Sequence, residues 1–202
     1  MNNSTKTIIA LALTSFFSVA AHAATPPTKG SGTIDTASAS LEWTGGVPIV
    51  VPGVYTQLTG LNGGAITQGE LDVNMDGSFG SKAGSVGQIV TELHTYDAET
   101  RVVGPLLTDA DATNVDWTLQ SNPMVNSSGS TDITTAAAFL TAHASTGQFK
   151  MENTKSAPVS GTPSDVNRIT WTVNSTKGGN LTDINQGDTI SVSAIVQAQT
   201  TF

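Results

Sequence analysis

The sequence lacks cysteine entirely and has few positive charges. The absence of cysteine excludes disulfide bonds, thiol catalysis, cysteine-ligated zinc and iron–sulfur clusters. Eight Lys and Arg residues stand against sixteen Asp and Glu residues, which gives a net charge of −8 at pH 7. No basic cluster occurs, so we do not expect nucleic acid or an anionic membrane surface as a partner. Stability must come from strand pairing and packing, or from partner proteins.

Apart from one N-terminal run, "IIALALTSFFSVA", the sequence has no apolar stretch that could cross a membrane. This run follows a short segment with a single charge, Lys6, and precedes the small residues "AHA". The pattern is typical of a secretory signal, and the run is too short for a membrane span. We therefore predict a signal peptide over residues 1–23, cleaved after Ala23. The remaining 179 residues (202 minus 23) suffice for one domain.

Short alternating segments dominate the rest of the sequence. The segment "GDTISVSAIVQAQTTF" at the end of the sequence places Ile190, Val192, Ala194 and Val196 on one face, and "TIDTASASLEWTGGV" alternates in the same way. Period-2 alternation is the signature of half-buried strands, and turn signals such as Asp-Gly separate the segments. The pattern predicts an all-β antiparallel sandwich or barrel. One short helix is expected in "DITTAAAFLTAHAS", residues 132–145.

Only one stretch suggests a metal site. "DVNMDG" (Asp72 to Gly77) matches the first half of a calcium loop, but the twelfth position, where a glutamate should close the coordination sphere, is Ala83. A strand that runs into an Asp-Gly turn explains the same residues without a metal. We expect no cofactor.

Candidate catalytic residues are scarce and scattered. His94 and His143 lie in separate segments without partners at the spacing of a zinc site or a triad, and we expect His94 to be exposed. Scattered acidic residues could serve a glycosidase, whose cleft would need aromatic side chains. The three tryptophans stand at inward-alternating positions, so core packing explains them better; they are Trp43, Trp117 and Trp171. We expect a protein that is not an enzyme.

Three segments together resemble a known family: "SLEWTGGVP" near the mature start, "AAAFL" in the middle and "TDINQGDTISVSAIV" at the end. The sequence resembles the structural pilins of the chaperone–usher pathway, and is most similar to cysteine-free major subunits of the colonisation-factor fimbriae of enterotoxigenic Escherichia coli. The resemblance implies an immunoglobulin-like antiparallel β-sandwich that is incomplete, because its last strand is missing. In that family, an N-terminal extension of the next subunit supplies the missing strand.

The resemblance also implies which residues make the subunit contact. The family's donor pattern (apolar, x, apolar, x, Gly, x, apolar) falls on one set of residues: Leu41, Trp43, Gly45 and Val47, with Ala39 before them. The acceptor groove, which is also the chaperone contact, falls on another set: Ile190, Val192, Ala194, Val196 and Phe202. The chaperone is expected to hold the terminal carboxylate. The expected organisation is a leader and donor strand over residues 24–47, followed by a pilin domain over residues 48–202.

The function implied is that of a structural subunit of a surface fimbria, or pilus, which polymerises by donor-strand exchange and supports adhesion to host cells. Its expected partners are identical or related pilin subunits in a linear homopolymer, a periplasmic chaperone, an outer-membrane usher, and a host glycan or protein receptor. The protein is then exported through the periplasm to the cell surface. The alternative is a secreted carbohydrate-binding module or a fimbrial tip adhesin, which would need an exposed aromatic platform.

Overall fold

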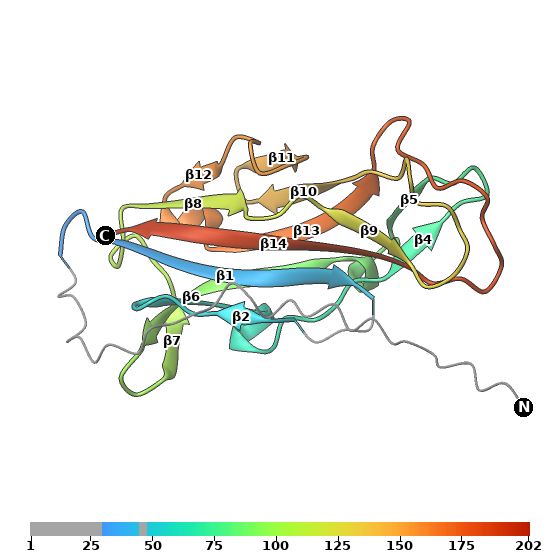
Figure 1. Ribbon diagram of the computed structural model, residues 1–202. Helices are drawn as coiled ribbons and strands as arrows, with labels where there is room; N and C mark the ends of the chain where they lie inside the picture. Colours follow the sequence, from blue (N-terminus) through green and yellow to red (C-terminus); the bar gives the residue numbers. More distant parts are fainter. Residues whose placement is uncertain (1–29, 45–47) are drawn as a thin grey trace, which may run out of the picture.

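The computed structural model describes residues 30–44 and 48–202, which form two antiparallel sheets (Figure 1). The first sheet has the strand order β12-β8-β14-β1-β2, and β9 pairs with β14 at its edge. Its strands are β1 (Ile34–Trp43), β2 (Val50–Val51), β8 (Asn114–Leu119), β9 (Met124–Ser127), β12 (Val159–Gly161) and β14 (Ile190–Thr201). The predicted signal peptide, Gly45 and Val47 lie outside the described residues.

The second sheet is built around β13, which pairs with β5, β6 and β10. Its strands are β3 (Thr56–Thr59), β4 (Leu71–Val73), β5 (Phe79–Ser81), β6 (Ile89–Asp97), β7 (Val102–Leu106), β10 (Ala138–Ala144), β11 (Gly147–Met151) and β13 (Arg168–Ser175). The helical elements are short: η1 (Leu61–Gly63), η2 (Ser85–Gly87) and α1 (Pro163–Val166). Within the described residues, no helix has both the length and the apolar character needed to cross a membrane.

The two sheets face each other across one apolar core. Trp117 of β8 and Trp171 of β13 meet edge to face, with ring centroids 5.8 Å apart, so the contact joins the two sheets. Both indole N–H groups donate hydrogen bonds, Trp117 to the Val166 carbonyl and Trp171 to the Thr91 hydroxyl. The prediction of an all-β antiparallel sandwich with a tryptophan core is confirmed.

The helix predicted over residues 132–145 is wrong. Residues 138–144 form strand β10, which pairs with β11 on one side and with β13 on the other. Ala138, Leu140 and Ala142 alternate into the core, so the period is 2 rather than 3.6. The three alanines favour a helix locally, but ladder hydrogen bonds on both edges outweigh that preference. The short helix that does form, α1, begins at Pro163, where proline suits the first turn.

The calcium-like segment forms a β-hairpin between β4 and β5. The Asn74 amide donates to the Ser78 carbonyl, and Gly77 closes the turn with a φ of 80°. The Asp76 carboxylate accepts hydrogen bonds from the amide and hydroxyl of Ser78, which lower its pKa. Asp76 thus forms a local turn contact, which explains the Asp-Gly sequence without a metal.

Candidate functional site: the β1–β14 strand pair

Strand β1 runs antiparallel to β14 along its full ten residues (Figure 1). At two inner positions a large side chain lies opposite a small one, since Leu41 pairs with Ala194 and Ala39 pairs with Val196. All four side chains are buried in the core. Alternation of large and small residues across a strand pair fills the space without voids. The two segments with the same alternating pattern are therefore neighbours in space.

The predicted donor and groove residues that the structure describes meet in this pair. Ala39, Leu41 and Trp43 lie on β1, and their partners in register are Val196, Ala194 and Val192, respectively. Ile190 begins β14 and pairs with β9 instead. Here one chain supplies both strands, whereas the resemblance implies a donor strand from another subunit. The division into donor and groove across two chains concerns an assembly and stays a prediction.

A buried carboxylate holds the first residues of β1. Asp35 is only 6% exposed, and it lies on the same inner face as Ala37 and Ala39. One of its oxygens accepts the Val54 amide at 2.7 Å, and the other accepts the Tyr55 amide at 2.9 Å and the Thr56 hydroxyl at 2.7 Å. Reasoning from the sequence missed Asp35. The residue stands at an inward-facing position of the alternating pattern, and a carboxylate in such a position needs polar partners inside the protein.

Trp43 is the last residue of β1, and contacts with the neighbouring backbone fix its side chain. Its indole nitrogen donates to the Gly87 carbonyl at 2.9 Å, and its side chain is buried. A Cβ atom at Gly69 would lie 2.3 Å from the Trp43 ring, so the backbone passes the indole closely enough that only glycine fits. The indole therefore occupies a socket that fits its ring and satisfies its N–H group.

Phe202 contacts the start of β1 rather than the middle of the pair. Its amide donates to the Thr33 carbonyl, and its carbonyl accepts the Gly32 amide. Its ring meets Tyr55 edge to face at 5.7 Å. Val196 is fully buried in the core opposite Ala39, whereas Phe202 lies at the end of the β1–β14 pair.

The backbone of β1 depends almost wholly on β14. On its other edge, within the described residues, β1 pairs with the two-residue β2 at Ser38 and Ala39. Two further backbone hydrogen bonds join the Ser40 amide to the Ile49 carbonyl and the Gly69 amide to the Glu42 carbonyl. Pro48 and Pro52 flank β2, and proline cannot donate to a ladder, which keeps this edge strand short. β1 is thus the first strand of the described residues, and β14 supplies most of its backbone pairing.

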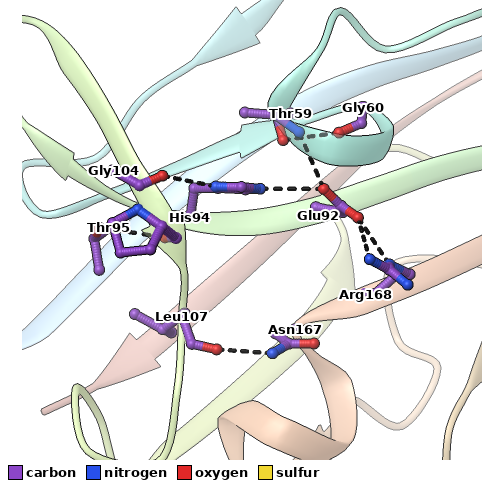
Figure 2. Close-up of polar contacts among 11 residues, drawn as sticks. Thr59, Gly60, Glu92, His94, Thr95, Gly104, Leu107, Asn167 and Arg168 are labelled. Carbon is purple, nitrogen blue, oxygen red and sulfur yellow. Dashed lines mark hydrogen bonds and ion pairs between the residues drawn. The ribbon is translucent and has the colours of Figure 1, made fainter.

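A second polar cluster lies on β6, in the other sheet (Figure 2). The Glu92 carboxylate is 1% exposed, and its oxygens contact Arg168 at 2.7 to 2.8 Å, His94 at 3.1 Å and the Gly63 amide at 3.2 Å. The His94 Nδ1 atom lies 2.8 Å from the Gly104 carbonyl. The expectation that His94 is exposed is wrong, since it is 7% exposed, because η1 and β7 cover this side of β6.

Glu92 links three elements, so its substitution should weaken the fold in a pH-dependent way. Burial raises its pKa, but hydrogen bonds from His94, Gly63 and Arg168 outweigh burial and leave the pKa below the usual value. A carboxylate with a lowered pKa stabilises the fold at neutral pH, and this contribution is lost as the pH falls through the folded-state pKa. We expect Glu92→Gln to lower the free energy of unfolding by about 2 kcal/mol at neutral pH.

Urea unfolding of both proteins between about pH 7 and about pH 3 checks this prediction. The difference in stability between wild type and Glu92→Gln should shrink as the pH falls. A difference that stays constant over this range would contradict the assignment.

Within residues 30–44 and 48–202, no group of three or more His, Asp or Glu side chains is placed to hold a metal ion. Comparisons of this chain with family models, with curated proteins and with solved structures find no match.

Proposed function

We propose that this chain is a structural subunit of a surface fimbria that polymerises by donor-strand exchange. The observation that supports this proposal is the place of β1: it is the first strand of the described residues, it lies inside the sheet between β14 and β2, and it follows the sequence pattern of the family's donor strand. Such a strand can leave its own sandwich and fill the same position in another copy.

The chemistry of β1 suits a strand that moves between copies. Its inner face carries apolar side chains that complete the core, and burial of a side chain such as Leu41 or Trp43 contributes about 2 to 3 kcal/mol. Its departure would uncover a groove floored by Val192, Ala194 and Val196. An uncovered apolar groove with a free strand edge aggregates unless a partner covers it.

This requirement explains the partners in the proposal. A periplasmic chaperone would cover the groove before assembly, an outer-membrane usher would order the exchange, and a second subunit would supply the final strand. Strand donation is heterologous, so it continues as an open filament and closes no ring. Adhesion to host cells, through a glycan or protein receptor, rests on the resemblance to fimbrial subunits.

The alternative, a secreted carbohydrate-binding module or tip adhesin, has less support. Such a module presents aromatic rings to solvent, but in the described part of the chain the large hydrophobic side chains that are exposed are all aliphatic. Trp43, Trp117 and Trp171 are all buried. Their rings pack the core and offer no platform for a sugar.

Deleting residues 24–47 tests the proposal. With the chaperone present, we expect the shortened subunit to fold and to form no fibres, because it can accept a strand but cannot donate one. Electron microscopy of both proteins provides the readout, with Thr36→Asp in the full chain as a control for a change on the exposed face of β1. If the shortened subunit forms fibres, β1 is not the donor strand.

A further inference from the structure

Both ring nitrogens of His94 face hydrogen-bond acceptors (Figure 2). Nδ1 lies 2.8 Å from the Gly104 carbonyl oxygen, and Nε2 lies 3.1 Å from a carboxylate oxygen of Glu92. A carbonyl oxygen and an ionised carboxylate can only accept, so each contact requires a proton on the nitrogen. A neutral imidazole carries one such proton, and an imidazolium carries two. The surroundings of His94 therefore match the imidazolium form.

Arg168 decides on which side of the His94–Glu92 contact the proton lies. Its guanidinium contacts the other oxygen of Glu92 through two nitrogens, at 2.7 and 2.8 Å. Charge-assisted bonds of this kind favour the ionised carboxylate, so the proton belongs to His94. The Arg168 side chain is half exposed, and water screens its repulsion of a cationic imidazole. Glu92 and His94 are both buried, so their attraction is screened much less.

The described elements that pack on β6 bring one further charge to this cluster, that of Arg168. β3, η1 and β7 contain no charged or titratable residue, and β13 contains only Arg168. On β6 itself, the titratable residues besides His94 are Glu92, Tyr96 and Asp97. Asp97 is exposed at the end of the strand, and a tyrosine is ordinarily neutral below about pH 10. The charge on His94 is therefore balanced by Glu92.

Loss of the second proton would break the contact between His94 and β7. The proton that stays is expected on Nε2, because the bond to the Glu92 carboxylate is charge-assisted. Nδ1 would then present a lone pair to the Gly104 carbonyl oxygen 2.8 Å away. His94 is buried, so water has little access to bridge the two atoms. Two acceptors in such a contact repel each other, and this part of β7 should separate from β6.

The middle of β7 has few other contacts that could hold it on β6. The pairing of the two strands shifts register between His94 and Tyr96, and Pro105 has no amide to donate. The Thr95 hydroxyl reaches the Pro105 carbonyl only at 3.3 Å. A Cβ atom at Gly104 would lie 2.2 Å from the Thr95 hydroxyl oxygen, so glycine allows the close approach that brings its carbonyl to His94.

We propose that His94 is a proton-dependent clamp, which holds β7 on β6 as long as its imidazole carries both protons. The opening is local, because Leu107 keeps two contacts that do not titrate: its amide donates to the Leu93 carbonyl, and its carbonyl accepts the Asn167 side-chain amide. A proton that the folded chain binds more tightly than the unfolded chain stabilises the fold at lower pH, and this contribution is lost as the pH rises. The dependence is opposite in sign to that of the Glu92 carboxylate. The clamp lies within one chain and is independent of the proposed function.

Nitrogen-15 NMR of the full chain counts the ring protons directly. An ordinary histidine is only about one-tenth protonated at about pH 7.5. An unmade buried hydrogen bond shifts this balance roughly tenfold, so we expect about half or more of His94 to carry both ring protons at this pH. His143 is the matched reference, because its Nε2 contacts the Thr172 hydroxyl, which can donate as well as accept. Equal protonation of the two histidines at this pH would overturn the proposal.

Amide hydrogen exchange tests the clamp on β7. Between about pH 6 and about pH 9, the protection of the β7 amides, corrected for the intrinsic effect of pH, should fall roughly tenfold relative to that of β10. His94→Gln, which does not titrate, should remove this pH dependence, and His143→Gln should leave it unchanged. A wild-type β7 whose protection does not change with pH, or the same dependence in His94→Gln, would show that His94 is not the clamp. The two wild-type measurements decide the matter even if His94→Gln does not fold.

Discussion

Replacing Leu41 with aspartate is expected to destabilise the single chain so far that most of it unfolds. Leu41 is fully buried near the end of β1, opposite Ala194. The substitution removes apolar burial and places a carboxylate where no partner is available, a combined loss of about 5 kcal/mol or more. Domains of this kind are stable by only about 5 to 15 kcal/mol in total.

The matched control for Leu41→Asp is Thr36→Asp, which adds the same charge to the exposed face of the same strand. Urea unfolding should show a loss of less than about 0.5 kcal/mol for this control. Leu41→Asp should also abolish fibre formation, since the strand would be unable to complete its own sandwich or a neighbour's. A stable, assembling Leu41→Asp protein would show that β1 contributes little to the core.

Asp35→Ala is the substitution with the second largest expected effect. The Asp35 carboxylate accepts hydrogen bonds from the amides of Val54 and Tyr55 and from the hydroxyl of Thr56. Removing this acceptor leaves three donors without their partner in a buried site, at a cost of about 3 kcal/mol. We expect the start of β1 to separate from the segment that follows β2.

Amide hydrogen exchange shows whether this loss is local. In Asp35→Ala, the Val54 and Tyr55 amides should lose protection against exchange. The amides of β13 should still exchange only through global unfolding. Asp35→Asn, which retains one acceptor oxygen, should lose less stability. The interpretation is wrong if Asp35→Ala is as stable as Asp116→Ala, which removes a carboxylate from the outer face of β8.

The strand pattern allowed much of the sandwich to be predicted from the sequence. Alternation identified β1 and β14 because the inner residues of both strands are mostly apolar and the outer ones mostly polar. The tryptophans were expected in the core for the same reason. Local alternation does not specify which strands pair, however, so the register between β1 and β14, more than 140 positions apart in the sequence, required the structure.

Each prediction that was wrong or missing has a specific physical cause. Three consecutive alanines suggested a helix at the start of β10, but pairing with β11 and β13 overrode this preference. His94 looked exposed because it lies on the face of β6 opposite Leu93, and nothing local shows that η1 and β7 cover that face. Asp35 was missed because a buried charge is recognised only through its partners, which lie about 20 positions away.

If β1 is an exchangeable strand, an isolated β1 peptide should bind in trans to a chain that lacks it. The chain without residues 24–47, released from its chaperone in the presence of a peptide of residues 30–47, should take up one peptide and become a stable, folded complex. A peptide with Leu41→Asp should bind at least about a hundredfold more weakly, since a loss of 1.4 kcal/mol is tenfold. Equal binding of both peptides, or a shortened chain that is equally stable without any peptide, would show that β1 is not an exchangeable strand.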